Sequence, residues 1–309
     1  MLIHNIYIIS WFGDNPSLRN YRKSKHQEQL KTILSFGIKF NIVILAQQYE
    51  ETDYYIHPDI TYIKSEEVKR PNLARNILKK HFYDTTEDYA LFLDDDVILT
   101  QEYIQLLAVY EQNIRTAFND YKIGTISVQY GLGNYSLRKD NSLIYINKMY
   151  RMEHKNPVLY LADKACPEAL YIMRNFKKLD NKEFYYDEDI KFSMGKDLQC
   201  SLLKEGFKTY YFWNMNNNFE NNTKPNSSTI AGFRNNYRDK DGDFYKARKR
   251  FFDKWSPELN IKISKDYTVQ DIRNVLLGMQ EKYVNLNEQP YKIVLTKQKN
   301  IGILLKEIK

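Results

Sequence analysis

Residues 88–103 have the sequence DYALFLDDDVILTQEY, in which three consecutive aspartates follow an apolar run. The segment YALFLDD is typical of a buried β-strand, so that Asp94, Asp95 and Asp96 fall where this strand ends. Adjacent carboxylates raise one another's pKa and destabilise a fold unless something positive lies between them. We therefore expect a compensating cation at this strand end.

The same alternation of apolar and amphipathic segments extends over the first 128 residues. The pattern predicts strands at 3–10, 40–46, 60–65, 89–95 and 123–130, and helices at 17–36, 70–82 and 101–118. Gly37 is placed to end the first helix, and Pro71 fits the first turn of the second. Strands that alternate with helices predict an α/β fold with a mostly parallel sheet, in which ligands bind at the carboxyl ends of the strands.

The second half of the chain has a looser pattern. Residues 129–162 are expected to form loops and a hairpin, followed by a strand at 165–173, an acidic turn and helix at 184–206, and a strand at 207–213. Residues 214–230 are polar and predict a mobile loop, and a capped helix at 268–284 precedes a strand-like tail from Tyr291. We predict a division at 1–128, 129–255 and 256–309: two halves of one α/β domain and a small C-terminal appendage.

The aspartates themselves suggest a metal site. Side chains alternate along a strand, which gives Asp94 and Asp96 one face and Asp95 the other. A hard divalent ion such as Mg²⁺ or Mn²⁺ takes oxygen ligands and normally binds substrate phosphates as well, so the outer pair are the candidate ligands. The alternative is that the aspartates cap the predicted helix after Thr100 or form a surface turn.

Three motifs together resemble a known family. ALFLDDDVIL resembles the strand-end DxD motif of family-two-like GT-A-fold glycosyltransferases, and NLARNIL at 72–78 resembles the helix that precedes this motif. YYDEDIKFSMGKDLQCSLLKEGFKTYYF resembles the acidic motif, helix and strand that follow in the acceptor half. The resemblance covers residues 1–255 and implies a GT-A (Rossmann-like) α/β fold with a nucleotide-sugar donor and a Mn²⁺ or Mg²⁺ cofactor.

The resemblance also implies roles for single residues. The implied donor-binding residues are Ser10, Arg75, Asn76, Asp94 and Asp95. Asp94 and Asp96 would hold the metal ion that bridges the donor's diphosphate. Asp189 would be the general base that deprotonates the acceptor hydroxyl, with Glu188 beside it. The alternative is that these two acidic residues complement the dipole of the helix that follows.

Two departures from the family pattern stand out. The second predicted strand is followed by Gln47 and Gln48 where related enzymes often have an acidic residue for the nucleotide. The last histidine is His154, so that no later histidine is available as a metal ligand. Asn214 or Asn216 would be the substitutes.

Residues 231–255, AGFRNNYRDKDGDFYKARKRFFDKW, combine eight Lys or Arg with four Asp and seven aromatic residues. Cations interleaved with rings suit a phosphate backbone with an exposed base. The predicted contacts to an acceptor or to phosphate are Arg234, Arg238, Lys246 and Trp255. The alternative is an ordinary helix with Phe251 and Trp255 on its core face.

Composition limits the choice of function and partner. The chain has 309 residues and a net charge of +7, which favours a polyanionic partner. No apolar run is long enough for a membrane helix and no secretion signal is visible, so we expect a cytoplasmic protein, in the host cytoplasm if viral. Cys166 and Cys200 share no metal-binding pattern.

These observations favour a glycosyltransferase that uses a nucleoside-diphosphate sugar. The expected acceptor is a hydroxymethylated pyrimidine in DNA, as in bacteriophage DNA-modifying sugar transferases, with a surface glycan or a protein as alternatives. A sugar nucleotidyltransferase is disfavoured, because SWFGDNPSLR has only one glycine after the first strand. The non-enzymatic alternative is a basic nucleic-acid-binding module with structural aspartates.

Overall fold

The computed structural model shows the chain as two compact units that interleave along the sequence. Unit 1 comprises Met1–Ala108, Ile172–Met194 and Asn218–Arg250, and unit 2 comprises Val109–Tyr171, Gly195–Asn217 and Phe251–Lys309. The structure describes residues 3–95, 97–99, 122–128, 135–137, 143–145, 150–154, 158–163, 170–190, 194–213, 219–221, 243–259, 261, 263–264, 282–285, 293–295 and 303–307. The predicted division at residues 128 and 255 stays a prediction.

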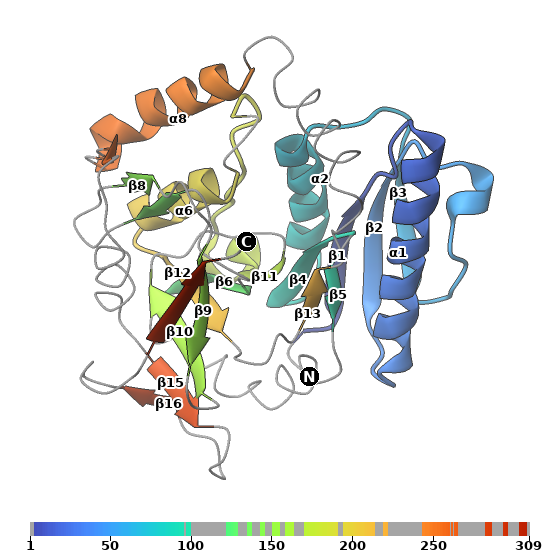
Figure 1. Ribbon diagram of the computed structural model, residues 1–309, viewed down its shortest axis with the longest axis horizontal. Coiled ribbons are helices and arrows are strands. Elements are labelled where there is room, and N and C mark those ends of the chain that lie inside the picture. Colours follow the sequence, from blue (N-terminus) through green and yellow to red (C-terminus); the bar gives the residue numbers. More distant parts are fainter. Residues whose placement is uncertain are drawn as a thin grey trace. The chain divides into compact units, whose positions relative to one another are not determined.

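Unit 1 is built on a mostly parallel sheet, in which β11 is the exception: the residue after its end, Asn175, donates its backbone N–H to Asp88, the residue before β4 begins (Figure 1). Its strands are β1 (Asn5–Ser10), β2 (Asn41–Gln47), β3 (Ile60–Ser65), β4 (Tyr89–Asp94) and β11 (Leu170–Arg174), in the order β11-β4-β1-β2-β3. β1 pairs in parallel with both β2 and β4, and β2 pairs in parallel with β3. Strands β1, β2 and β4 are buried over most of their length, as their continuous apolar sequences predict.

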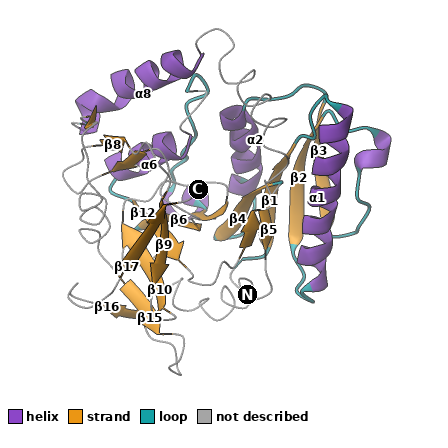
Figure 2. Cartoon of the chain, viewed as in Figure 1, coloured by secondary structure: helices purple, strands orange, loops and turns teal. Residues whose placement is uncertain are grey.

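Two helices cover this sheet. α1 (Pro16–Ser35) begins at Asn15, whose side chain accepts hydrogen bonds from the backbone N–H groups of Ser17 and Leu18. α2 (Pro71–Tyr83) has proline in its first turn, as predicted. The chain moves outward from β1 to β2 and returns from β3 to β4, so right-handed crossovers place α1 and α2 on opposite faces. Figure 2 shows β1 and β2 between the two helices.

The smaller elements of unit 1 lie around this frame. They are the 3₁₀-helix η1 (Glu51–Asp53), β5 (Val97–Leu99), α5 (Phe176–Asp180) and β13 (Phe219–Asn221). β13 pairs antiparallel with β5, which corrects the prediction of an unbroken loop over 214–230. The correction has a simple cause: strand pairing with a partner over a hundred residues away leaves no local sequence signal.

Unit 2 contains a mixed sheet in the order β16-β15-β10-β12-β6. Its strands are β6 (Ile123–Val128), β10 (Val158–Asp163), β12 (Lys208–Trp213), β15 (Lys282–Asn285) and β16 (Ile293–Leu295). β12 is parallel to β6, whereas β10 is antiparallel to both β12 and β15. The strand β10 falls inside 129–162, where only loops and a hairpin were expected.

The remaining strands of unit 2 form two small sheets. They are β7 (Tyr135–Leu137), β8 (Leu143–Tyr145), β9 (Tyr150–His154), β14 (Ile263–Ser264) and β17 (Ile303–Glu307). The expected hairpin is β7 with β8, and β14 adds to it in parallel, while β17 pairs antiparallel with β9. Strands β14, β15 and β17, all beyond residue 260, therefore pair with strands of residues 143–163. The predicted strand-like tail from Tyr291 is confirmed by β16 and β17.

Two further helices are α6 (Met194–Lys204) and α8 (Asp243–Leu259). After α6, Gly206 adopts a φ of +80°, the left-handed conformation expected from a helix-ending glycine. α8 forms from the basic, aromatic stretch, and it buries Ala247, Phe251 and Trp255 at a spacing of four residues.

The predicted fold class, an α/β fold with a mostly parallel sheet flanked by helices, is confirmed. The predicted helix 101–118 and residues 268–281 of the predicted helix 268–284 lie outside the described residues, whereas the last three positions of the latter belong to strand β15, so the helix cannot extend to residue 284 as predicted. Among the residues that the structure describes, no helix combines the length and apolar character required to cross a membrane.

Candidate active site

Two aspartates lie at the carboxyl end of β4, where β1 also ends. The register aligns Ile9 of β1 with Asp94, so that Ser10 and Trp11 emerge beside the aspartates. The side chain of Asp94 keeps 37% of its surface exposed, and that of Asp95 only 5%. The two neighbours therefore meet different surroundings, as the alternation along the strand predicts.

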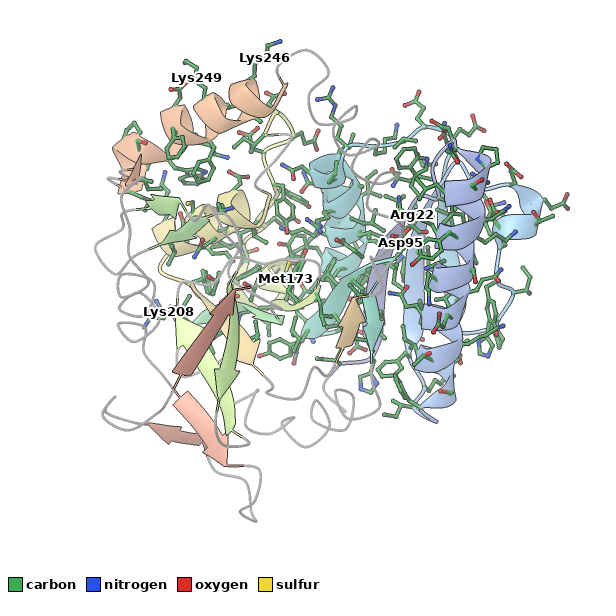
Figure 3. All side chains as sticks on the ribbon, in the orientation of Figure 1. Arg22, Asp95, Met173, Lys208, Lys246 and Lys249 are labelled. Atoms are coloured by element: carbon green, nitrogen blue, oxygen red, sulfur yellow. The ribbon has the colours of Figure 1, made fainter. Side chains whose placement is uncertain are left out.

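Asp95 is held by groups of the protein itself. Its carboxylate accepts hydrogen bonds from Ser10 Oγ at 3.0 Å and from the Trp11 backbone N–H at 3.2 Å. Arg22 of α1 donates to the other oxygen at 2.9 Å (Figure 3). The expected cation beside Asp95 is thus a guanidinium, and the carboxylate fastens β4 to α1 and to the chain after β1. The predicted role of Asp95 in donor binding stays a prediction.

Asp94 faces the opposite helix. Its Oδ1 accepts a hydrogen bond from Arg75 of α2 at 2.8 Å, in an ion pair. Burial by surrounding atoms raises the pKa of Asp94, and the Arg75 guanidinium partly offsets that rise. Its solvent-exposed part makes Asp94 the more accessible of the two carboxylates. Asp96, the second predicted metal ligand, lies outside the described residues.

Residues that the sequence did not single out brace this strand end. Gln29 of α1 is buried, and its Nε2 donates to the backbone carbonyls of Asp94 at 2.9 Å and Val97 at 2.5 Å. The imidazole of His26 lies 3.1 Å from Gln29 Oε1, and burial lowers the pKa of His26. The sequence signal that could have indicated this contact is a glutamine beside the apolar positions of the predicted first helix.

Polar and aromatic residues that follow β1 and β2 surround the same end of the sheet. Tyr49 donates its hydroxyl to Ser10 Oγ at 2.6 Å, and its ring stacks on Phe12. Burial raises the pKa of the Tyr49 hydroxyl, which therefore stays protonated. Gln48 accepts a hydrogen bond from the Trp11 indole at 3.2 Å. Ser10 is thus linked both to Asp95 and to this aromatic cluster.

The acidic turn at 187–189 is also held by α2. Asn72 donates from Nδ2 to the backbone carbonyls of Asp187 at 2.7 Å and Ile190 at 2.5 Å. Asn76, one turn later, exchanges hydrogen bonds with the backbone of Tyr186 and donates to Glu188 Oε1 at 3.1 Å. Arg75 lies between the two asparagines in the sequence, so one turn of α2 supports both Asp94 and the acidic turn.

Asp189 has the exposure expected of a group that meets a substrate. Its side chain is 72% exposed, and its Oδ2 lies 2.9 Å from a guanidinium nitrogen of Arg250. The Nε of Arg250 lies 3.2 Å from Asp187 Oδ1. This arginine of α8 was not among the predicted site residues, although it belongs to the basic stretch that was singled out.

The other predicted acceptor contacts have different outcomes. Arg234 and Arg238 lie outside the described residues, and Lys246 is exposed on α8 (Figure 3). Trp255 is 4% exposed, and its indole donates to the buried Asp197 at 2.8 Å. A ring this buried offers no face for stacking on a base. Trp255 is therefore corrected from a ligand contact to a core residue of unit 2.

The described residues include one of the two predicted metal ligands, Asp94. Among them, no three His, Cys, Asp or Glu side chains are grouped so that they could hold a metal ion. Mg²⁺ often takes one or two carboxylates and completes its shell with water and phosphate oxygens. Asp94, with its exposed carboxylate edge, fits one such position, whereas the oxygens of Asp95 are already hydrogen-bonded. Asp94 and Asp96 remain the residues that would hold the ion.

Comparisons with known proteins add structural neighbours only. No family model and no curated protein matches the sequence. Residues 1–349 of TarS from S. aureus are similar over 82% of this chain and 72% of that chain, at 11% identity and a TM-score of 0.44. The same TarS fragment in complex with UDP-GlcNAc is similar over 82% of this chain and 73% of that chain, at 11% identity and a TM-score of 0.43.

A197 from STIV is similar over 68% of this chain and 81% of that chain, at 14% identity and a TM-score of 0.34. Because these TM-scores are below 0.5, what those proteins bind or do is not transferred to this chain.

Proposed function

We propose that this protein is a metal-dependent glycosyltransferase that moves a sugar from a nucleoside-diphosphate sugar to an acceptor hydroxyl. The observation that carries the proposal is the double role of α2 within unit 1. Arg75 holds Asp94 at the carboxyl end of β4, and Asn72 and Asn76 hold the acidic turn that presents Asp189. A donor-side carboxylate and an exposed candidate base are thus fixed by one rigid element.

The donor would bind where β1 and β4 end. In parallel sheets ligands bind at the carboxyl ends of the strands, and here that edge carries Ser10, Asp94 and the guanidinium of Arg75. Asp94 and Asp96 would hold a Mg²⁺ or Mn²⁺ ion, which neutralises charge on a departing diphosphate when it is bound. Arg75 and Asp95 keep the strand end in place and do not depend on the donor for their partners.

Asp189 would take the proton of the acceptor. As the acceptor oxygen forms its bond to the anomeric carbon, the bond from that carbon to the diphosphate breaks, and the hydroxyl proton passes to the Asp189 carboxylate. A base for this step must reach the substrate, and Asp189 is the most exposed carboxylate of the acidic turn for which an ion pair is seen. Glu188, hydrogen-bonded to Asn76, would position the turn.

We further propose that the acceptor is a polyanion, namely DNA with hydroxymethylated pyrimidines. The net charge of +7 favours such a partner, and Lys246 and Lys249 on α8 extend into solvent (Figure 3). A hydroxymethyl group supplies the nucleophilic oxygen that the chemistry requires.

A thermal-shift panel tests the donor side. Nucleoside diphosphates are added with and without Mn²⁺ to the wild type, to Asp94→Asn, to Asp96→Ala and to the matched control Asp14→Asn. We expect metal-dependent stabilisation of the wild type and the control, and its loss in both site variants. Equal shifts in all four proteins, or none in any, would remove the glycosyltransferase proposal.

The acceptor is tested separately by mass spectrometry. Duplex DNA with hydroxymethylated or plain pyrimidines is incubated with nucleotide sugars and Mn²⁺, using the wild type and Asp189→Asn. We expect a mass gain on the hydroxymethylated DNA with the wild type alone. If donors bind but no DNA gains mass, the DNA acceptor is discarded and the transferase proposal stands.

A further inference from the structure

A recess lies at the amino end of strands β1, β2 and β3 of unit 1, opposite to the edge that carries Asp94. It is a pocket of about 300 Å³. Its floor comes from three neighbouring strands: Asn5 is in register with Asn41, and Tyr7 with Val43, which in turn is in register with Thr61. Residues two apart on a strand face the same side of the sheet. At about 3.3 Å per residue, the five steps from Asn5 to Ser10 separate the two sites by roughly 17 Å.

The wall of the pocket is a segment after α2 that is held in place. It contributes Thr85, Thr86 and Glu87 to the lining. The fully buried Asn175 donates from Nδ2 to the backbone carbonyls of Phe82 at 3.2 Å and Glu87 at 3.0 Å. Its backbone N–H also donates to the Asp88 carbonyl at 2.8 Å. The position of Glu87 is therefore fixed by the fold and does not depend on a ligand.

His81, from the last turn of α2, is the other fixed polar group. Its Nδ1 lies 3.1 Å from the hydroxyl of Tyr7, whose side chain is fully buried. Burial, with a smaller effect of the Glu87 charge, raises the pKa of the Tyr7 hydroxyl. Tyr7 thus stays protonated and can donate to Nδ1, which leaves the Nε2–H of His81 as a donor at the pocket.

The charge of the lining is negative in a chain with 46 Lys and Arg residues. Asp59 and Glu87 line the pocket, and no lysine or arginine does so among the described residues. Within the described part of the chain the Glu87 carboxylate makes no ion pair or hydrogen bond. The Asp59 carboxylate has one charged or chargeable neighbour among the described residues, the imidazole of His57, whose Nδ1 lies 3.8 Å from Oδ2. The other polar lining residues are amides and hydroxyls, such as the nearly buried Asn5 and the more exposed Thr61.

We propose that this pocket binds a small organic cation through a primary ammonium group. Two carboxylates with no lysine or arginine partner among the described residues attract a positive charge and repel phosphate. An ammonium group donates three hydrogen bonds, which suits a lining of carboxylate, amide and hydroxyl oxygens. The volume is at the lower limit for ligand pockets, so the ligand is small.

The proposal is independent of the glycosyltransferase function and is tested by calorimetry with a matched pair of probes. Putrescine carries an ammonium group at each end, and 1,4-butanediol replaces both by hydroxyls at nearly the same length. We expect putrescine to bind at millimolar concentrations, more weakly as salt is added, and the diol not to bind. Failure of putrescine to bind, or equal binding of the diol, would overturn the proposal.

Variants locate the binding. Glu87→Gln should weaken putrescine binding about tenfold or more, because hydrogen bonds between charged groups are the strong ones. Asp59→Asn should weaken it as well, so the test does not depend on one variant. Glu66→Gln changes an exposed acidic residue outside the pocket and should bind as the wild type does. Unchanged affinity in both pocket variants would show that putrescine binds elsewhere.

Discussion

The two ends of the parallel strands β1 to β4 in unit 1 carry carboxylates in contrasting surroundings. At the carboxyl end, Asp94 and Asp95 each face an arginine, supplied by a different helix. At the amino end, Asp59 and Glu87 face a pocket with no lysine or arginine among its described lining residues. Asp95 is buried and held by the fold and Asp94 keeps an exposed edge beside Arg75, whereas Asp59 and Glu87 are left for a ligand. The difference shows that acidic residues in one fold can serve stability or binding, depending on what packs against them.

The largest effect on stability is expected from Arg22→Met. Asp95 would remain buried with its charge and without its guanidinium partner, which costs about 3 kcal/mol of unfolding free energy. Urea unfolding at neutral pH measures the loss. The double variant Arg22→Met with Asp95→Asn should be more stable than the single variant, because the uncompensated charge is gone. If the double variant is less stable than Arg22→Met, burial of the charge is not what destabilises it.

A smaller loss is expected from Asn175→Ala, which acts at the amino end. The change leaves the Glu87 carbonyl without its donor and removes one hydrogen bond to the Phe82 carbonyl, which Thr85 still contacts, and it should cost about 2 kcal/mol. Hydrogen exchange should show faster exchange at residues 84–88, and putrescine should bind more weakly. An unchanged exchange pattern would mean that the wall of the pocket does not depend on Asn175.

Asp94 should give a pH-dependent difference of known sign. Its pKa is raised in the folded protein, so folding favours the protonated form. The stability that this group contributes is present below the ordinary pKa of aspartate and is lost as the pH rises through the raised folded value. Relative to Asp94→Asn, the wild type should thus become less stable from about pH 4 towards neutrality. Urea unfolding of both proteins across this range checks the sign, and a difference that grows in favour of the wild type would contradict it.

The smallest effect is expected from Glu87→Gln. Since this carboxylate makes no ion pair or hydrogen bond with the described residues, its loss should change the free energy of unfolding by less than about 0.5 kcal/mol. Thermal unfolding in the absence of ligand measures this. A large destabilisation would show that Glu87 stabilises the fold as Asp95 does, and the contrast between the two ends of the sheet would no longer hold.

The sequence predicted the strands and helices of residues 3–95 closely, because each has a strong local signal. β1 and β2 are apolar runs, Pro71 starts α2, and Gly206 ends α6 in a left-handed conformation. The prediction failed at β10 and β13, which depend on partners far along the chain. For the site, the exposure of Asp189 and the pairing of Asp94 with Arg75 agree with the expected neighbourhood, while their predicted roles stay predictions.

The sequence by itself determined that carboxylates lie at the end of a buried strand and before a helix. It could do so because the periodicity of strands and helices depends on the local order of residues. Only the tertiary structure decided which carboxylate is hydrogen-bonded within the fold and which stays accessible to solvent. Asp95 meets Ser10 and Arg22, Trp255 meets Asp197, and Arg250 meets Asp189, in each case across many residues of chain. Such partners are selected by packing of whole elements, which fixes charge and solvent access at each side chain, and no local pattern carries that information.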